Sequence, residues 1–529
     1  MKKNYFYWWL SIFILIGAFL RIIKLDKNPP HLGNDEISIA YDSYSIRTTG
    51  KDEYGTFLPL SFKSHRDYKA PFYTYLNVPF NFIFGNNEYG VRFLSALAGT
   101  FGILLIGLIG RILGDDKVGV LSAFLLAINP KSIFVSRMSY ESNLASILIL
   151  LGIYFILKFK KILKNKYLIF AGVAFGFSIW TYHTQKGLVP LLLVMFPILW
   201  FKSIKFKKWS RLWITTLLII LPIIWDFIFV QMKDPYNRAS SQIWFQSKSI
   251  QNYLHSTNDI TFIKAIKILI DPVVRYVDHF DLDLLFFRGL DLFDKYEPLN
   301  IGWFLVATLP ILILGLVKLK NILGIDNCIL LIVWWLICPI VPSLTQGEVS
   351  AVRNLSFIAP TIIIMAVGLS SLIKNQRLFF ITTVLILLNF AYFLVSYFIN
   401  FPKIASDRFQ YGYKQAWLEI KPIFNDFDSV IVEPRFGQYG QFVGLPRLYF
   451  GYFGAFNSID MLNRNDELNN IGKVWIRNVN WNAEIVEDNS IYIVSVSNPI
   501  NDKLNEKLEL MSTIFKTNGD KQFLIYKTK

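Results

Sequence analysis

The chain has 529 residues, of which 53% are hydrophobic and only 17% charged, with a mean hydropathy of +0.40. This composition excludes a soluble multidomain protein and predicts an integral membrane protein. The net charge of +16 comes from the first 400 residues, where 39 Lys and Arg stand against 23 Asp and Glu, because residues 401–529 carry 15 of each. The basicity is therefore a sign of membrane topology, and it does not indicate nucleic-acid binding.

Eleven apolar segments predict transmembrane helices, and we take thirteen as the upper bound of the count. The first segment resembles a signal peptide, but no small-residue cleavage site follows it, so we expect it to be retained as a span. The eleven segments lie near residues 6–25, 90–112, 117–135, 143–160, 167–183, 186–201, 211–231, 301–318, 327–344, 355–373 and 378–400.

The lysine-rich connections all fall on one side of this eleven-span arrangement. They are Lys2 and Lys3 and the segments 158–166, 202–211, 318–320 and 374–377. The positive-inside rule makes this side cytoplasmic. We therefore expect a multi-pass protein of the plasma (inner) membrane with a cytoplasmic N-terminus. The long loops 26–89 and 232–300 and the C-terminal tail then lie on the extracytoplasmic side.

Within the first loop, the segment Pro71–Phe84 is apolar but only 14 residues long and contains Pro79. It is too short to span, and we expect a helix along the membrane surface. The chain thus divides into a transmembrane domain, residues 1–400, and a tail, residues 401–529. Strand patterns in the tail at 429–432, 474–479, 491–496 and 523–526, with helical patterns at 414–424 and 501–514, predict a small α/β accessory domain.

A pair of adjacent carboxylates, Asp35 and Glu36, follows the first predicted span and opens a helical pattern, ISIAYDSYSIRTTG. Asn34 before them is a good helix cap, and acids in a first turn suit the helix dipole, so a structural role would explain the pair equally well. Basic residues also stand at the outer ends of the predicted spans, at Lys69, Arg92, Arg137 and Arg353.

Each of these basic residues alone is readily explained as an interface anchor, because long cationic side chains snorkel to the membrane surface. As a set, these residues predict a catalytic site. A carboxylate pair together with several cations on one membrane face is what a site needs to bind a phosphate diester and to activate a hydroxyl group.

The order and spacing of several motifs over residues 1–400 resemble a known family. The motifs are NDEISIAYDSYSIRTTG, YKAPFYTYLNVPFNFIFGNNEYGVRFLSALAGT, RMSYESNLA, WTYHTQKGLVPLL and EVSAVRNLSFIAP. Together they are similar to the membrane glycosyltransferases of the C-type fold, specifically the protein O-mannosyltransferase-like group (glycosyltransferase family 39) and the related aminoarabinose transferases that modify lipid A.

The resemblance implies that Asp35 is the catalytic general base and Glu36 its neighbour in acceptor or sugar contacts. Lys69 and Arg353 would bind the donor phosphate, and Glu141, in the place of an acidic residue often found there, would contact substrate. Outside the resemblance, the charge pattern adds Arg92 as a phosphate contact and Arg137 as a substrate contact. His183 is a candidate substrate contact at the outer face, and a structural histidine held by hydrogen bonds explains it equally well. The aminoarabinose transferases have Glu-Lys-Pro where this chain has Tyr68-Lys69-Ala70-Pro71, so a carboxylate beside the lysine, and any metal site built on it, is not carried over.

The implied activity is inverting transfer of a hexosyl or pentosyl group from a polyprenyl-phosphate donor to an extracytoplasmic acceptor, which could be a protein, a lipid or a cell-envelope glycan. A polyprenyl phosphate is a good leaving group that needs only fixed cations, and the attacking hydroxyl needs a carboxylate, so we expect neither a metal nor another cofactor. The sequence leaves the sugar and the acceptor open.

Other motifs favour structural roles. Asp281-Leu282-Asp283 imitates the metal-nucleotide motif of soluble glycosyltransferases, but the topology places it outside, away from nucleotide sugars. His31, His65, His255 and His279 lack metal-ligand spacing, and Cys328 and Cys338 lie too far apart within one helical segment for a disulfide.

Two functions of other classes stay open. A transporter or lipid flippase would be expected to have internal half-repeats with broken spans in matching positions, and it is disfavoured by the two large outer loops and the terminal soluble domain. A non-catalytic cell-envelope scaffold would have no need of the Asp35 carboxylate.

Overall fold

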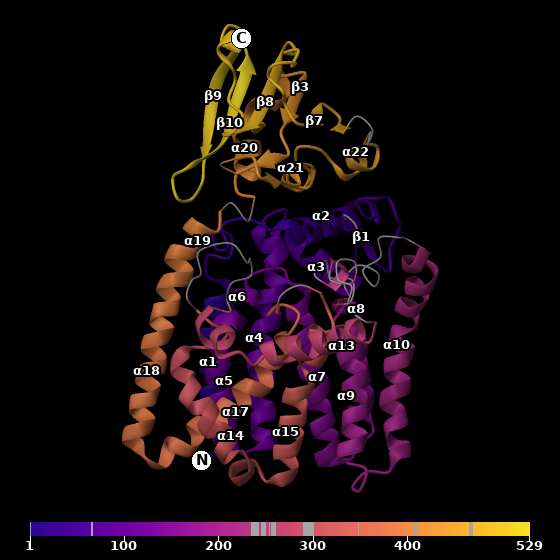
Figure 1. Cartoon of the computed structure of the whole chain (residues 1–529), viewed down its shortest axis with the longest axis vertical. Helices are drawn as coiled ribbons and strands as arrows, with labels where there is room; N and C mark the ends of the chain where they lie inside the picture. The colour runs from indigo at the N-terminus through magenta and orange to yellow at the C-terminus, as the bar shows by residue number, and fades with distance from the viewer. Residues whose placement is uncertain are drawn as a thin grey trace. The chain divides into compact units, whose positions relative to one another are not determined.

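The computed structural model of the chain describes residues 2–64, 67–233, 243–244, 250–252, 254, 261–288, 301–346, 349–406, 410–437, 439–464 and 469–529. The chain forms two compact units (Figure 1). The first contains residues 1–23, 60–73 and 95–394, and the second contains residues 24–59, 74–94 and 395–529.

The first unit is a bundle of apolar helices, and each of the eleven predicted segments is helical in it. The helices are α1 (Lys2–Ile22), α4 (Glu88–Leu113), α5 (Asp116–Ala127), α6 (Pro130–Ser136), α7 (Glu141–Ile162), α8 (Lys166–Thr181), α9 (Gln185–Leu199), α10 (Ser210–Phe229), α14 (Leu309–Leu323), α15 (Ile325–Ile337), α17 (Ile358–Ser371) and α18 (Gln376–Val395). The first unit also contains a short antiparallel pair of strands, β1 (Phe62–Ser64) and β2 (Asp67–Lys69), which carries the candidate residue Lys69.

Eight helices among the described residues are long and apolar enough to cross a membrane, so the protein is a multi-pass membrane protein. The pair α5 and α6 adds a ninth span if it counts as one helix bent by 58°. The bend follows from Pro130, which begins α6, and from Asn129, whose side chain accepts a hydrogen bond from the Ser132 amide at 2.8 Å. The two remaining predicted segments are the shorter apolar helices α8 and α9. The count of eleven stays a prediction.

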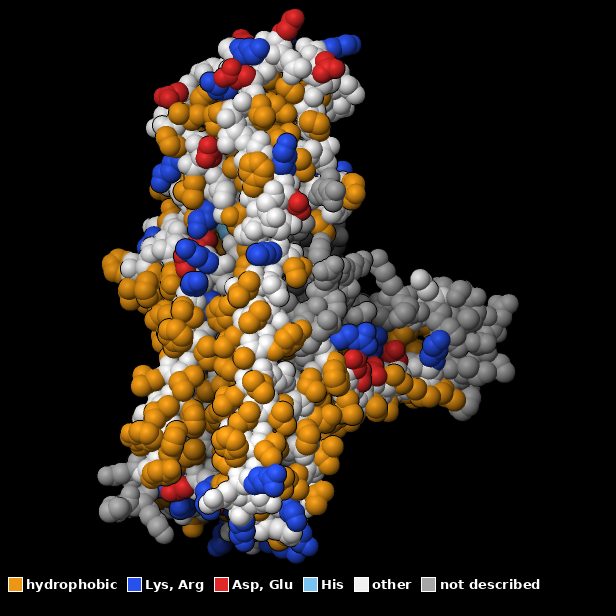
Figure 2. All heavy atoms as spheres, turned by 90° about the vertical axis from the view of Figure 1, so that its left-hand side faces the viewer, with side chains coloured by type: hydrophobic (Ala, Val, Ile, Leu, Met, Phe, Trp, Pro, Cys, Tyr) orange, Lys and Arg blue, Asp and Glu red, His pale blue; other side chains and the backbone are white. Residues whose placement is uncertain are grey.

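One end of the bundle is basic. Figure 2 shows Lys and Arg side chains gathered there, below a broad belt of hydrophobic side chains. On α18, the apolar side chains of Phe380 and Leu388 are 68% and 63% exposed. The lysines of the connections α7–α8 and α9–α10 supply much of this charge. An apolar belt with a basic rim is the pattern on which the positive-inside rule rests.

The predicted orientation can be tested with cysteine labelling in intact cells. In a variant without Cys328 and Cys338, we expect a cysteine at exposed Asn482 of the tail to react with an impermeant thiol reagent. A cysteine at exposed Lys164, between α7 and α8, should react only after lysis. The reverse pattern would overturn the topology. Ser458 is a poor labelling position because it is buried and lies 2.8 Å from the Thr48 hydroxyl.

The second unit joins the C-terminal tail to two segments of the first loop. Its helices are α2 (Asn34–Thr49), most of α3 (Pro71–Phe84), the first turns of α4, α19 (Phe401–Ile404), α20 (Tyr413–Ile420), α21 (Pro446–Phe453) and α22 (Ser458–Leu462). The predicted helix over Pro71–Phe84 is thus confirmed, and its position along the membrane surface stays a prediction. The expected domains, residues 1–400 and 401–529, stay a prediction.

A six-stranded mixed sheet forms the core of the tail, in the order β6-β7-β3-β8-β10-β9. The strands are β3 (Ser429–Val432), β6 (Asn470–Ile471), β7 (Val474–Ile476), β8 (Ser490–Ser495), β9 (Leu508–Phe515) and β10 (Lys521–Thr528). Strand β3 is parallel to both β7 and β8, whereas β10 is antiparallel to β8 and β9. Buried Ile431, Tyr492 and Leu524 pack on one face.

The prediction of a helix over residues 501–514 is wrong, because residues 508–515 form strand β9. The apolar residues have helical spacing, but β9 is an edge strand, only one face of which is covered. A hairpin through Asn518 and Gly519 joins it to β10, and Gly519 has φ +93°. Asn-Gly between two apolar runs is a strong hairpin signal, and it overrides the helical periodicity.

Candidate functional site

Helix α2 begins at Asn34 and carries the predicted carboxylate pair in its first turn. Asp35 is exposed, whereas the side chain of Glu36 is only 1% exposed. Adjacent side chains diverge by about 100° around an α-helix, which explains why one carboxylate points outward and the other inward. Asp35 therefore stands at the positive end of the helix dipole, where a negative charge is stabilised.

Arg92 of α4 holds the inward carboxylate. Its Nε donates to Glu36 Oε1 at 2.9 Å and its Nη2 to Oε2 at 3.0 Å, a bidentate pair with both side chains buried. Glu36 Oε2 also accepts the Gly33 amide at 2.9 Å, which closes the first turn of α2. The ion pair thus fixes the start of the helix that presents Asp35.

The remaining N–H groups of Arg92 donate to backbone carbonyls. Nη1 donates to Leu25 at 3.0 Å and to Pro29 at 2.9 Å, and Nη2 donates to His31 at 2.6 Å. All five N–H donors of the guanidinium are occupied. A phosphate at Arg92 would have to displace a complete set of buried hydrogen bonds, and the same contacts hold both oxygens of Glu36. The roles of Arg92 in donor binding and of Glu36 in sugar or acceptor contacts stay predictions.

The tail reaches this region through a second buried carboxylate, Glu88, at the start of α4. Lys414 Nζ of α20 donates to its two oxygens at 2.6 and 2.8 Å. The His31 ring lies 3.7 Å from Glu88 and packs against Tyr449 of α21, with ring centroids 4.7 Å apart. Burial lowers the pKa of His31, so the ring is neutral near pH 7. The Tyr449 hydroxyl donates to the Leu32 carbonyl.

The far end of α2 is held by the tail as well. Arg464 donates to the Glu53 carbonyl at 2.6 Å, and Arg447 lies 3.6 Å from the Glu53 carboxylate. The tail therefore contacts both segments that flank α2. These contacts could not be predicted from the sequence, because each joins residues several hundred positions apart. Removing the tail would expose Glu88 and Leu32, so the tail is part of the structure that holds Asp35.

In the first unit, Lys69 ends strand β2, pairs with Phe62 of β1 and is 7% exposed. His183, after α8, lies with Nε2 2.8 Å from the Tyr68 carbonyl oxygen, so Nε2 carries the hydrogen and donates. The Phe72 ring stacks on Phe177 of α8, with centroids 4.5 Å apart. These contacts hold the strand that presents Lys69, and they give His183 a structural partner.

Arg353 lies on the turn before α17 and is half-buried. Its Nη1 donates to the Thr345 hydroxyl at 2.9 Å and to the Gln346 carbonyl at 2.6 Å. Arg275 of α13 (Thr261–Asp278) donates to the Thr345 carbonyl at 3.1 Å. The segment Thr345–Gln346 thus links Arg353 to α13. Helix α13 is amphipathic and belongs to the predicted loop 232–300, and the structure describes only part of that loop.

Arg137 and Glu141 flank the α6–α7 connection. Arg137 is fully buried, and its Nη1 donates to the Leu20 carbonyl of α1 at 2.9 Å. This bond ties α6 to α1. Glu141 is the first residue of α7 and is half-buried.

The other candidates have structural explanations. Asp281 accepts the Asp283 amide at 3.0 Å, and Asp283 accepts from Arg288 Nε at 2.6 Å. His65 and His255 lie outside the described residues. Within the described parts of the chain, no group of three or more His, Cys, Asp or Glu residues could hold a metal ion.

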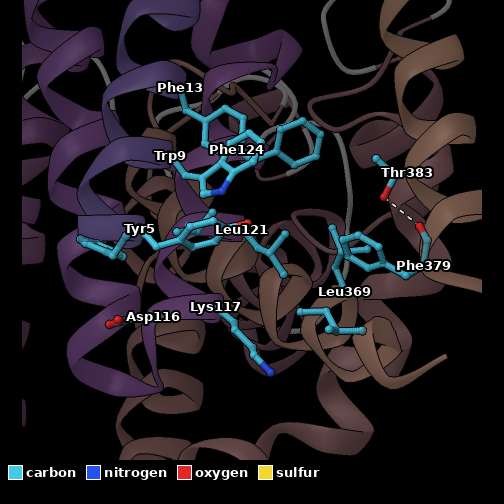
Figure 3. Close-up of a pocket in the computed structure, with 13 residues that line it drawn as sticks. Tyr5, Trp9, Phe13, Asp116, Lys117, Leu121, Phe124, Leu369, Phe379 and Thr383 are labelled. Atoms are coloured by element: carbon cyan, nitrogen blue, oxygen red, sulfur yellow. Dashed lines mark hydrogen bonds between the residues drawn. The ribbon is translucent and has the colours of Figure 1, made fainter. Parts of the chain in front are cut away.

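A cavity of about 520 Å³ lies elsewhere in the first unit, between α1, α5, α17 and α18 (Figure 3). Its lining is almost entirely apolar and includes Trp9, Phe13 and Phe124. The candidate residues described above do not line it. An apolar lining of this kind does not suit the binding of a phosphate or the activation of a hydroxyl group.

Comparison with known proteins agrees with the resemblance found in the sequence. A family model described as dolichyl-phosphate-mannose-protein mannosyltransferase matches residues 68–225, well under half of the chain. The matched stretch contains Lys69, Arg92, Arg137, Glu141 and His183. No curated protein matches the sequence.

Two solved structures share the fold. ArnT from Cupriavidus metallidurans, bound to undecaprenyl phosphate, is similar with a TM-score of 0.56 at 12% identity, over 98% of each chain. The oligosaccharyltransferase AglB from Archaeoglobus fulgidus, in complex with an inhibitory peptide and a dolichol-phosphate, is similar with a TM-score of 0.51 at 14% identity. That alignment covers 85% of this chain and 63% of AglB. The resemblance to C-type-fold glycosyltransferases of the mannosyltransferase and ArnT type is therefore confirmed.

Proposed function

We infer that the protein is an inverting glycosyltransferase that moves a sugar from a polyprenyl-phosphate donor to a hydroxyl group of an extracytoplasmic acceptor. The fold it shares with ArnT and AglB and the family match over residues 68–225 support this class. The observation that carries the proposal is the division of the acidic pair. Asp35 is exposed at the start of α2, while Glu36 is buried against Arg92.

Asp35 accepts the proton of the attacking hydroxyl as its oxygen bonds to the anomeric carbon. The bond from that carbon to the phosphate oxygen breaks, and its electron pair leaves with the polyprenyl phosphate. Lys69 and Arg353 stabilise the charge that develops there, because charge-assisted contacts to phosphate are the stronger class of hydrogen bond. The residues of this chain thus account for the proton and for the leaving group.

The buried position of Glu36 supports a single displacement. Retention would need a carboxylate nucleophile in addition to an acid or base. Glu36 cannot be that nucleophile while both of its oxygens are held by Arg92. Glu141 is the other carboxylate that the sequence offered, and in this proposal it contacts substrate.

The donor assignment is tested with purified protein in vesicles that contain a polyprenyl-phosphate-linked sugar. Lys69→Ala and Arg353→Ala should each reduce donor use by about ten- to a hundredfold, the cost of one charge-assisted contact of roughly 1.5–3 kcal/mol. Lys63→Ala is the matched control, because Lys63 is an exposed lysine of the same hairpin. Unchanged turnover in Lys69→Ala would remove that residue from the proposal, and turnover with a nucleotide sugar would overturn the donor class.

A further inference from the structure

The cavity of Figure 3 lies beside α18, a helix with little buried surface. Only 11% of the most apolar 18-residue stretch within Gln376–Ile404 is buried. Figure 1 shows α18 at the margin of the bundle. The space between α18 and helices α1, α5 and α17 has a volume of about 520 Å³. This size lies within the range of roughly 300–1,000 Å³ that is usual for sites of small ligands.

The lining suits a hydrocarbon chain. Figure 3 shows the rings of Trp9, Phe13 and Phe124 gathered at one end, and the Phe13 and Phe124 centroids are 5.3 Å apart. The Thr383 hydroxyl, on the α18 wall, donates to the Phe379 carbonyl at 2.8 Å. A water molecule in an apolar space of this kind would lack hydrogen-bond partners, whereas the surrounding membrane supplies acyl chains.

The charges at the other end select the headgroup. Lys117 lines the cavity there and is exposed, while the neighbouring Asp116 is neutralised by Arg111 at 2.6 Å. Two further exposed cations lie near the lining residues in sequence. Lys374 directly follows Ile373, and Arg377, in the first turn of α18, lies two positions before Phe379. This end of the bundle is the basic rim that the topology assigns to the cytoplasmic leaflet, where anionic headgroups concentrate near such residues.

We propose that this groove binds one acyl chain of an anionic phospholipid of the cytoplasmic leaflet, with the lipid phosphate at Lys117. The lipid fills the space between α18 and the bundle and fixes α18 against α5 and α17. The site is separate from Lys69 and Arg353, and it does not depend on the proposed transfer reaction.

Native mass spectrometry of the full-length protein tests this site. Protein is released from vesicles of equal phosphatidylglycerol and phosphatidylcholine with identical chains, and the retained lipids are counted. We expect one phosphatidylglycerol molecule to be retained, with a preference of about tenfold that corresponds to one charge-assisted contact. Lys117→Gln should bring the two lipids close to equal retention, and Lys207→Gln, another exposed lysine of the basic rim, should leave the preference intact.

Two variants fill the groove from opposite walls, Val120→Trp on α5 and Thr383→Trp on α18. Either one should abolish retention in protein whose melting temperature is unchanged, whereas Leu385→Trp on the exposed face of α18 should retain the lipid. Wild-type protein without retained phospholipid would overturn the proposal. So would equal retention of both lipids by the wild type, loss in Leu385→Trp as complete as in the two groove variants, or displacement of the phospholipid by added polyprenyl phosphate.

Discussion

Asp35→Asn should lower the rate of sugar transfer by a factor of about 10² to 10⁴, the usual cost of losing a general base. Asparagine keeps the shape of aspartate and is well tolerated in a first helical turn, but it cannot accept the proton of the attacking hydroxyl. The Glu36–Arg92 pair that holds the start of α2 does not involve the Asp35 side chain. Donor affinity should therefore stay at the wild-type level. The melting temperature should fall only slightly, because the loss of the charge at the start of α2 costs about 0.3–1 kcal/mol.

The measurement is single-turnover transfer from a polyprenyl-phosphate-linked sugar by purified protein, with donor binding measured separately. Asp488→Asn is the matched control, because Asp488 is an exposed carboxylate of the tail. Near-normal transfer by Asp35→Asn would exclude Asp35 as the base. A scaffold would show no transfer in either form, and a flippase would move the lipid without releasing polyprenyl phosphate.

Arg92→Met should have the largest effect on stability, a loss of about 3–5 kcal/mol, because it leaves the Glu36 carboxylate buried without its charged partner. It also releases the carbonyls of Leu25, Pro29 and His31 from their donor. We expect a clear fall in the melting temperature of the purified protein, and reduced transfer because the start of α2 is no longer held.

The double variant Glu36→Gln with Arg92→Met separates the contribution of the ion pair from that of the hydrogen bonds between Arg92 and the backbone carbonyls. Removing the buried charge together with its partner should recover part of the stability lost in Arg92→Met. Arg92→Met protein with an unchanged melting temperature and weak donor binding would contradict this role, and would restore Arg92 as a phosphate ligand.

The helices were predictable because apolar periodicity and span length are local properties of the sequence. The four strand patterns of the tail lie within or overlap β3, β7, β8 and β10 for the same reason. Strand β9 was not predictable in this way, because the spacing of its apolar residues fits a helix. Its extended conformation is decided by pairing with β10. The Asn518-Gly519 turn was the signal that could have corrected it.

The site was predictable in part. Two adjacent carboxylates on one helix must diverge, so the sequence alone indicated that Asp35 and Glu36 have different surroundings. The partner of Glu36 was not evident, because Arg92 lies 56 positions away and looks like an interface anchor. The contact between Lys414 and Glu88 spans 326 positions, and only the folded chain reveals that the tail helps to hold α2.

The anomeric configuration of the product tests the central claim most directly. Wild-type protein in vesicles is supplied with a polyprenyl-phosphate-linked sugar of known configuration and with membranes that contain the acceptor, and the new linkage is determined by NMR. We expect the configuration opposite to that of the donor, because in the proposed mechanism Asp35 is the base and Glu36, held by Arg92, is no nucleophile. A product with the configuration of the donor would contradict the account.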